Sequence, residues 1–286
     1  MLSVPFGERG LRQADGVFQH VKQLSPLLLR LFSEVDRASI GAVAVSTSPT
    51  AQPDSYMPVF LVGFRQAEAL AAALGVQLVR VDHQSGHIRA ALYGNEALLS
   101  REQFFAVHIS GGTTDVLLVK PHRDAPYEIT RIGTSTDLHA GQFVDRVGVA
   151  LGLSFPAGRR LEELALQAED RNVKLASAVK GTDCSFSGAE SAAQRLMNDT
   201  PKAEIAYGVY DCLARTLSKM FTAAQAQHGE LPFLVCGGVA SSALLRTLLR
   251  QRFAGTLYFG EPALSADNAA GVALLGADRM ETVWNN

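Results

Sequence analysis

Short apolar runs of strand type alternate with amphipathic helical stretches along this chain, and this alternation constrains the fold more than any other feature. A buried strand is predicted over residues 40–46, a helix over 58–74 and a second strand over 77–81. Strand, loop and helix in this order are typical of an α/β fold. Residues 103–133 instead indicate three consecutive antiparallel strands, so we expect a second lobe to begin near residue 105.

Helical periodicity marks both ends of the chain. Apolar side chains recur every three or four residues over residues 11–35, where Pro26 predicts a kink. The remaining chain predicts strands at FLVCG and LYF, and helices at about 137–152, 160–168, 188–198, 202–227, from 240 and from 267. Helices and strands thus alternate to the end, as expected of an α/β protein.

Composition and charge exclude several classes of protein. The 286 residues are 47% hydrophobic and 19% charged, as in globular proteins, and three cysteines without CxxC spacing indicate reduced thiols rather than disulfides. The net charge is -2, so no general attraction to polyanions or anionic membranes is expected. Arg246, Arg250 and Arg252 form at most a local basic patch, and a solvated helix face explains them better. The reduced cysteines favour a cytoplasmic protein, and because no 18-residue apolar run occurs we expect no membrane contact.

Two apolar strands each run directly into a Gly-Gly pair, in FFAVHISGG and in LPFLVCGG. Glycine lets the backbone approach a ligand closely, and successive N–H groups or a helix N-terminus can hold a phosphate. A tight turn explains either pair alone. Two such turns together favour a nucleotide site.

Histidines provide a candidate metal site. His83 and His87 are four residues apart, so on a helix both imidazoles face the same way; two surface histidines are an equally good interpretation of the pair alone. Gln84 stands where a zinc protease needs glutamate, which disfavours peptide hydrolysis. His108, at the end of a predicted strand, is a third candidate ligand or a core histidine. Asp267 is expected to cap the last helix unless the histidines converge on it.

Two further side chains are candidates for a binding or catalytic role. Asp145 lies in a stretch that a solvated helix face explains, but its carboxylate could also accept hydrogen bonds from a ribose. Cys184 has no histidine next to it in sequence, so a buried turn is a better interpretation than a nucleophile.

Taken together, the chain resembles the tRNA threonylcarbamoyladenosine transferase family, long labelled O-sialoglycoprotein endopeptidases. The resemblance runs over nearly the whole chain, and GLRQADGVFQHVKQLSPLL further resembles a divergent bacterial subgroup. The matching blocks, in order, are VDHQSGHIRAAL, HISGGTTDVLLV, GTSTDLHAGQFVDRVGVALGL with FPAG, DCSFSGAESA, LVCGGVASSALLR and LSADNAAGVALLG. The resemblance implies a two-lobed actin-like (ASKHA, ribonuclease H-like) α/β fold, with residues 1–104 and 268–286 in an incomplete N-terminal lobe and residues 105–267 in a C-terminal lobe that carries the SGG phosphate hairpin.

The resemblance also implies the site residues. One divalent metal, iron or zinc, would be bound by His83, His87 and Asp267, with His108 as a candidate fourth ligand. An ATP- or AMP-type nucleotide would contact Ser110, Gly111, Gly112, Asp145, Gly158, Gly237, Gly238 and Ser242. In that family the N6 amine of a tRNA adenosine attacks the carbamoyl carbon of threonylcarbamoyl-AMP, and AMP leaves.

Departures from the family pattern leave alternatives open. The first strands with their phosphate loop have no counterpart, Gln142 replaces an acidic residue, Ser242 an asparagine, and Thr113-Thr114-Asp115 a more usual His-Thr-Gln. The leading hypothesis is a metal- and nucleotide-binding member of the family. A non-catalytic paralogue acting as an interaction or regulatory subunit is the alternative, and a metalloprotease is third. Partner proteins of the threonylcarbamoylation machinery are expected, with tRNA bound only together with them, and a homodimer is a further candidate.

Overall fold

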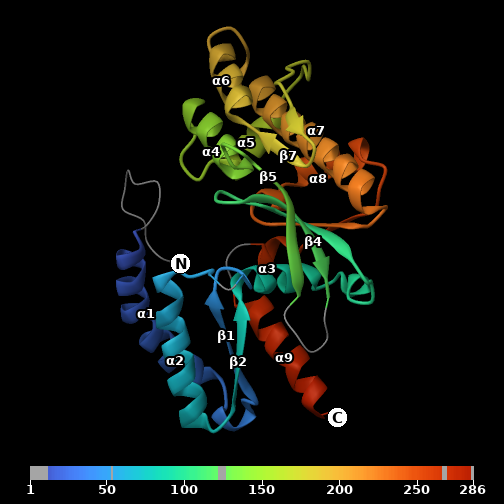
Figure 1. The fold of residues 1–286 in the computed structure, drawn as a ribbon. Helices are drawn as coiled ribbons and strands as arrows, with labels where there is room; N and C mark the ends of the chain where they lie inside the picture. Colours follow the sequence, from blue (N-terminus) through green and yellow to red (C-terminus); the bar gives the residue numbers. More distant parts are fainter. Residues whose placement is uncertain (1–11, 53, 122–126, 266–268, 285–286) are drawn as a thin grey trace. The chain divides into compact units, whose positions relative to one another are not determined.

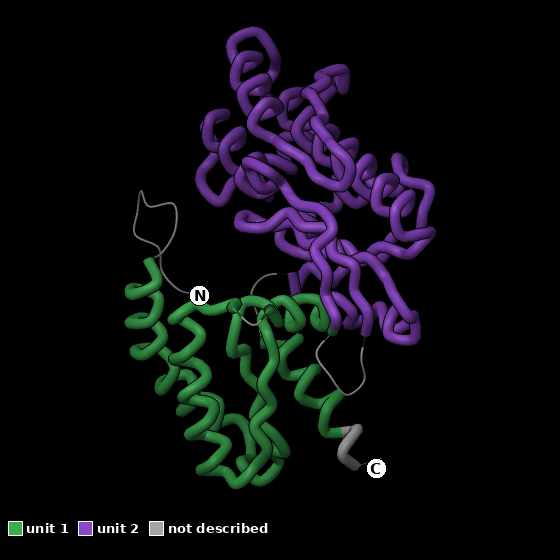
Figure 2. The backbone as a smooth tube through the Cα atoms, viewed as in Figure 1, with its two compact units in different colours: residues 1–90, 122–127, 268–286 green, residues 91–121, 128–267 purple. Residues whose placement is uncertain are grey.

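The computed structural model describes residues 12–52, 54–121, 127–265 and 269–284. The chain forms two compact units, one from residues 1–90, 122–127 and 268–286 and the other from 91–121 and 128–267, coloured separately in Figure 2.

The first unit is built around two parallel strands, β1 (Ala42–Ser48) and β2 (Gln77–Asp82), which Figure 1 shows side by side and pointing the same way. Helix α2 (Pro58–Leu74) connects them and has the bounds that the sequence predicts. Proline suits a first helical turn, and the left-handed Gly75, with φ 69°, ends the helix. The β1–α2–β2 order confirms the α/β prediction for this part.

Three other helices complete the first unit: α1 (Gln13–Glu34), which continues through Pro26, α3 (His83–Leu92), whose last residues belong to the second unit, and α9 (Ala270–Trp284). The alternation of β1 places Val45 toward Gly63 of α2 and Ala44 toward Gly276 of α9. The two strands therefore lie between helices on both faces, as parallel strands require.

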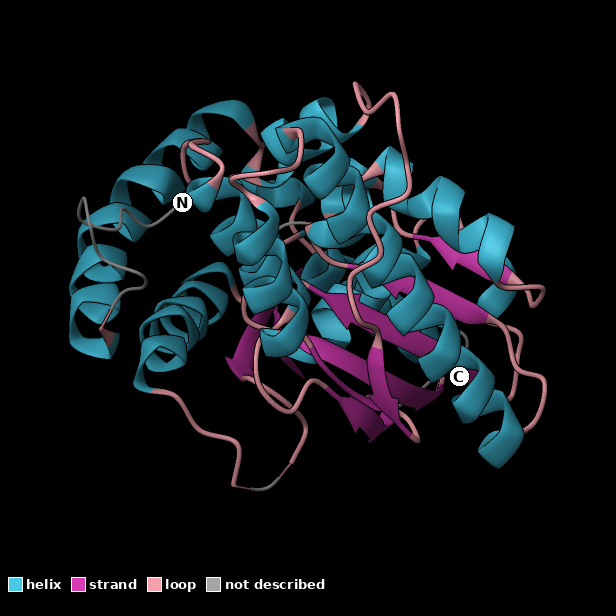
Figure 3. Ribbon diagram, turned by 90° about the horizontal axis from the view of Figure 1, so that it is seen from above, coloured by secondary structure: helices cyan, strands magenta, loops and turns pink. Residues whose placement is uncertain are grey.

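The second unit contains a five-stranded sheet in the order β5-β4-β3-β8-β9. Strands β3 (Phe104–Ile109), β4 (Thr114–Lys120) and β5 (Glu128–Thr134) are consecutive and antiparallel, as predicted from the sequence. Strands β8 (Phe233–Cys236) and β9 (Leu257–Phe259) extend the sheet in parallel to β3. Figure 3 distinguishes the strands from the helices around them.

In its described residues, the second unit has five α-helices that lie wholly within it: α4 (Ala140–Ala150), α5 (Gly158–Ala165), α6 (Ser187–Leu196), α7 (Lys202–His228) and α8 (Ala243–Arg252). Their apolar faces form one core with one face of the sheet. At its centre the ring of Phe233 stacks on Phe221 and on Phe105, with ring centroids 4.4 and 4.6 Å apart. Such aromatic pairs stabilise a core beyond the area that they bury.

The structure differs from the sequence prediction at several element bounds and by one small hairpin; β1, for example, begins two residues later than predicted and α8 about three. Helix α4 begins three residues later than predicted, because the carboxylate of Asp137 accepts hydrogen bonds from the N–H groups of Leu138 and Phe186 instead of belonging to the helix. A small hairpin of β6 (Ala178–Lys180) and β7 (Asp183–Ser185) was not predicted. Within the described ranges, no helix combines the length and the apolar character that crossing a bilayer demands.

Candidate functional site

The two Gly-Gly turns lie at the same edge of the sheet. Strand β3 pairs in parallel with β8, and the last pair in the register is His108 with Cys236, so the turns that follow both strands are neighbours. Gly237 has a φ of 97°, and a Cβ there would lie 2.4 Å from the carbonyl oxygen of Ile109. Only glycine fits this position, because both its conformation and its closeness to β3 exclude a side chain.

The turn after β3 packs on the N-terminus of α4. The N–H of Gly141 donates to the carbonyl of Ser110 at 3.0 Å, and the N–H of Ala140 donates to Oγ1 of Thr114 at 2.8 Å. A Cβ at Gly141 would lie 2.6 Å from the backbone nitrogen of Gly111. Glycine at this point of the helix therefore allows the turn and the helix to meet.

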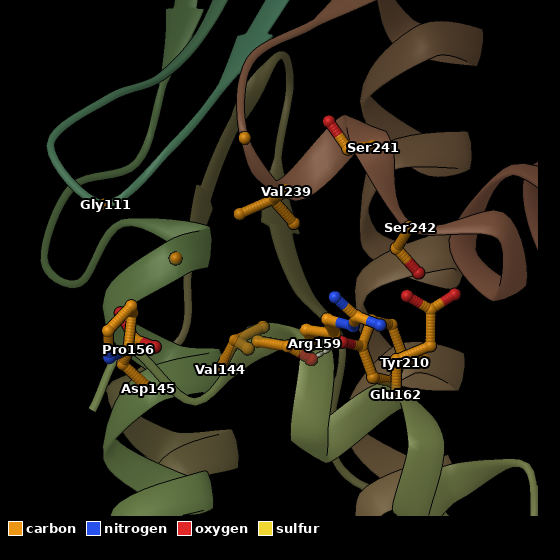
Figure 4. Close-up of a pocket in the computed structure, with 13 residues that line it drawn as sticks. Gly111, Val144, Asp145, Pro156, Arg159, Glu162, Tyr210, Val239, Ser241 and Ser242 are labelled. Atoms are coloured by element: carbon orange, nitrogen blue, oxygen red, sulfur yellow. Dashed lines mark hydrogen bonds between the residues drawn. The ribbon is translucent and has the colours of Figure 1, made fainter. Parts of the chain in front are cut away.

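A pocket of about 560 Å³ opens beside these two turns, within the second unit. Its volume is in the usual range for small-molecule sites. Figure 4 shows the residues around it, which come from α4, α5 and α7, from the turn after β3, from the loop before α5 and from the segment between β8 and α8. The lining residues are Gly111, Gly141, Val144, Asp145, Pro156, Gly158, Arg159, Glu162, Tyr210, Gly238, Val239, Ser241 and Ser242.

Several residues predicted to bind a nucleotide line this pocket, and the others are sequence neighbours of lining residues. Gly111, Asp145, Gly158, Gly238 and Ser242 are lining residues. The other predicted positions, which are next to lining residues in the two turns, are Ser110, Gly112 and Gly237. The structure thus brings together residues that are more than 100 positions apart in sequence.

Neither backbone conformation nor packing against the described residues requires glycine at positions 111 and 238. Neither residue has a positive φ, and no heavy atom lies within 4 Å of where a Cβ would be. In the described part of the chain, neither N–H group donates a hydrogen bond to a protein acceptor. Both positions therefore offer a bare backbone donor at the pocket, the arrangement that anions use in proteins.

Asp145 is half-buried at the pocket wall. Its Oδ1 accepts a hydrogen bond of 2.7 Å from the N–H of Ala157, which follows the Phe155-Pro156 peptide. Burial raises the pKa of the Asp145 carboxyl, while hydrogen bonds from the N–H groups of Ala157 and Gly158 act in the opposite direction. The carboxylate has acceptor sites beyond those two bonds, so it can also bind hydroxyl groups of a ligand.

Glu162 and Tyr210 are pocket residues that sequence reasoning missed. Oε1 of Glu162 accepts from the N–H of Leu244 at 2.8 Å, and the Tyr210 hydroxyl donates to the carbonyl of Gly158 at 2.8 Å. Ser242 acts beside them, where its hydroxyl accepts from Leu245 N–H at 3.1 Å as the N-cap of α8. No local sequence pattern indicates these roles. The contacts of Glu162 and Tyr210 join different elements, and the cap made by Ser242 can be predicted only if the start of α8 is known.

Gln142 and Cys184 have structural roles. Oε1 of Gln142 accepts a hydrogen bond of 3.1 Å from the N–H of His139, which closes the first turn of α4. Cys184 is buried in β7, and burial raises the pKa of its thiol to about 12. A thiol that stays protonated at neutral pH is a poor nucleophile.

His83 and His87 lie on one face of α3 in the first unit, as their spacing predicts. Their Nε2 atoms are 3.0 Å apart, and the ring centroids are 4.4 Å apart. The buried Asp82 fixes the start of this helix, because its carboxylate accepts from the N–H of Ser85 at 2.8 Å and from its hydroxyl at 2.6 Å. Two nitrogens bound at about 2.0–2.1 Å in tetrahedral geometry to one zinc ion lie about 3.3 Å apart, close to the spacing of this pair, so the pair fits two positions of a metal site.

The structure does not test the other two predicted metal ligands against this pair. Asp267 lies outside the described residues, and His108 belongs to the second unit. Among the residues that the structure describes, no group of three histidine, cysteine or acidic side chains is arranged to hold a metal ion.

Comparison with known proteins gives a family and a fold. The sequence model of the tRNA N6-adenosine threonylcarbamoyltransferase (TsaD) family matches residues 15–274. Similar solved structures include HypF of T. kodakarensis (TM-score 0.59, 17% identity, 79% of this chain and 40% of that one). They also include full-length HypF in a phosphate- and nucleotide-bound form (0.57, 13%, 79% and 38%) and a ROK family protein of Streptococcus pneumoniae TIGR4 in complex with sucrose (0.52, 14%, 92% and 88%).

These structural similarities concern the fold. This chain spans about two fifths of the length of the two HypF chains. HypF and ROK proteins share the actin-like (ASKHA) α/β fold, so the predicted fold class is confirmed.

Proposed function

Because the chain belongs to the tRNA N6-adenosine threonylcarbamoyltransferase family, we propose that it binds an adenine nucleotide and a divalent metal ion and transfers threonylcarbamoyl to N6 of a tRNA adenosine. The observation that carries this proposal is the pocket of the second unit. Its volume is about 560 Å³ and its rim carries two bare glycine N–H groups. A nucleotide needs both features, because its phosphate requires donors and its base and ribose require space.

In the proposed site, phosphate and ribose are bound by different parts of the pocket. The phosphate would accept hydrogen bonds from the N–H groups of Gly111 and Gly238, where no side chain stands in the way. The ribose hydroxyls would donate to the carboxylate of Asp145. The phosphate- and nucleotide-bound HypF structure shares this fold and supports the assignment by analogy.

The proposed metal ion would be held by His83 and His87, together with Asp267 and with His108 as a candidate. The separation of 3.0 Å between the two Nε2 atoms supports this pair as ligands. When bound, the ion would supply Lewis acidity toward an oxygen of the substrate. Because both histidines belong to α3, the helix would keep their imidazoles at a fixed spacing for the ion.

The proposed reaction exchanges an oxygen for a nitrogen at the carbamoyl carbon. The N6 amine of the tRNA adenosine attacks this carbon in threonylcarbamoyl-AMP and forms a carbon–nitrogen bond. The bond from that carbon to the phosphate oxygen breaks, AMP leaves with the electron pair, and the amine loses a proton. The chain would contribute orientation, because the pocket binds AMP before and after transfer and fixes the position of the reacting carbon. Partner proteins would help to bind the tRNA.

A second candidate function is that of a non-catalytic paralogue, an interaction or regulatory subunit. The observation in its favour concerns the two positions that depart from the family pattern. Gln142 binds the main chain of His139, and Ser242 binds the main chain of Leu245. Both side chains are thus engaged in helix caps, and a chain that uses them in this way could retain binding and lose transfer.

Two measurements on the full chain separate these functions. Calorimetry measures the affinity for AMP in the wild type, in Asp145→Asn and in the control Asp199→Asn, which makes the same change outside the pocket. Mass spectrometry of nucleosides then measures modified adenosine after incubation of the metal-loaded chain and partner proteins of the threonylcarbamoylation machinery with threonylcarbamoyl-AMP and an unmodified tRNA transcript.

We expect AMP binding that Asp145→Asn weakens and Asp199→Asn does not, together with modified adenosine. Binding without modification would favour the non-catalytic paralogue. Absence of AMP binding would overturn the nucleotide site.

A further inference from the structure

Positively charged side chains gather along one face of α7, on the helix and on the elements beside it. None of them lines the pocket. Tyr207, Asp211, Arg215 and Lys219 follow one another at intervals of four residues, so they occupy one face of this helix. The extended segment of residues 171–177 runs along the same face.

Contacts with α7 fix the segment in place. The guanidinium of Arg171 lies 4.9 Å from the centroid of the Tyr207 ring. About two turns further along α7, Arg215 donates from Nη2 to the carbonyl of Leu175 at 2.6 Å. Positive side chains of both elements are therefore held in one row before any ligand binds.

Asp211 is the only acidic member of the row and is fully buried. Its carboxylate accepts from Nε of Arg215 at 2.8 Å, is bonded to the guanidinium of Arg252, and lies 3.5 Å from Nζ of Lys174. A buried carboxylate needs partners, but one cation is enough to balance its charge. Three cations around one carboxylate leave an excess of positive charge, although the chain as a whole has a net charge of -2.

Two more cations of the row have no carboxylate beside them. Lys219 donates from Nζ to the carbonyl of Ser177 at 3.1 Å, and Arg171 contacts the Tyr207 ring. Within the described ranges, no carboxylate oxygen lies within 4 Å of the nitrogens of either side chain. We call the five cations the α7 strip: Arg171, Lys174, Arg215, Lys219 and Arg252.

We propose that the α7 strip binds the phosphate backbone of an RNA and, resting on the proposed function, that of the tRNA substrate. The row from residue 207 to residue 219 is about 18 Å long, because a helix rises 1.5 Å per residue. One strand of B-DNA has one phosphate per about 3.4 Å of its axis, so a row of this length faces about five phosphates if the RNA spacing is similar. A row of cations held at fixed positions suits a regularly charged polymer.

The chemistry of the surface favours RNA over a membrane. Surfaces that bind lipid combine basic residues with apolar side chains that enter the bilayer. None of the large exposed apolar side chains in the described structure belongs to residues 171–177 or 207–219, and Tyr207 is only 7% exposed. The α7 strip thus offers charge and hydrogen-bond donors without an apolar anchor, as contacts to phosphates do.

The test measures binding of an unmodified tRNA transcript to the full chain by fluorescence anisotropy at several KCl concentrations. The double variant Lys174→Ala/Lys219→Ala removes two cations of the strip and leaves two arginines on Asp211. The control Lys120→Ala/Arg195→Ala removes two cations of the same unit outside the strip. We expect the strip variant to bind about 30-fold more weakly at 0.15 M salt, with a salt slope smaller by about 1.8. The control should change the affinity by less than about twofold.

Equal losses of tRNA affinity in the two double variants would overturn the proposal, and so would a wild type that does not bind tRNA. Poly-glutamate that competes as strongly as tRNA at equal charge would also overturn it, because this result would indicate an acidic protein partner. AMP affinity is measured on the same samples. If the strip variant also loses AMP binding, Lys174→Arg/Lys219→Arg decides, because retained tRNA affinity supports the strip and lost affinity contradicts it. A wild type that binds tRNA but forms no modified adenosine refutes the transferase function and not the strip.

Discussion

Gly141→Ala tests whether the turn after β3 and the start of α4 must touch. In an ordinary helix interior this change stabilises by about 1 kcal/mol, because alanine is the better helix former. Here the new Cβ would lie 2.6 Å from the nitrogen of Gly111 and 2.7 Å from the carbonyl carbon of Ser110. Both are backbone atoms, so the turn must move, and overpacking of this kind costs about 1–3 kcal/mol.

The same movement stretches the hydrogen bond of 3.0 Å from Gly141 N–H to Ser110, which contributes about 1 kcal/mol. We therefore expect Gly141→Ala to lower the free energy of unfolding by about 1–3 kcal/mol in total. Urea denaturation followed by circular dichroism measures it. Gly188→Ala in α6 is the control, because no atom lies within 4 Å of its Cβ position, and it should be neutral or stabilising. A Gly141→Ala protein as stable as this control would refute the contact.

Three further predictions concern charge and metal. Burial raises the folded-state pKa of Asp145 above its usual 3.8, so the charged carboxylate lowers stability once the pH rises through that value. Asp145→Asn should therefore raise the free energy of unfolding at pH 7 and change it little near pH 3. Urea denaturation at several pH values measures this difference. Asp211→Ala leaves three cations without their carboxylate and should cost about 3–5 kcal/mol of unfolding free energy, whereas an effect under 1 kcal/mol would contradict the buried network. His83→Ala should lower the metal content measured by mass spectrometry after loading with zinc or iron, while His20→Ala should not; equal metal in both variants would exclude His83 as a ligand.

Local signals predicted most elements of the fold. Proline at the start and glycine after the end fix α2 at its predicted bounds, and apolar runs mark β3 and β8. The β6 and β7 strands escaped prediction because each has three residues and includes polar ones, whereas the equally short β9 is a wholly apolar LYF run. The start of α4 was misplaced because Asp137 is a helix-start residue by type, and its partner Phe186 is far away in sequence.

The site could be predicted only in part, because it depends on strand pairing and helix packing. The two Gly-Gly turns were visible in the sequence, but their meeting requires β3 and β8 to be neighbours, which no local pattern specifies. Glu162 enters the pocket only because α5 packs beside α8, where its carboxylate binds Leu244. Motif spacing therefore found the backbone donors and Asp145, and tertiary packing added the other side chains.

The central claim is that the pocket of the second unit binds an adenine nucleotide against bare glycine backbone. Calorimetric titration of AMP into the wild type and into Gly111→Ala tests it most directly, because alanine at this position meets no protein atom within 4 Å. The account predicts one AMP per wild-type chain and a variant that melts at the same temperature as the wild type. The variant keeps its backbone N–H, but its methyl group would hold the phosphate away from that donor. AMP affinity should then be at least about tenfold weaker, because a charge-assisted hydrogen bond that can no longer form is worth about 1.5–3 kcal/mol. Equal affinities in the two proteins, or no binding by the wild type, would contradict it.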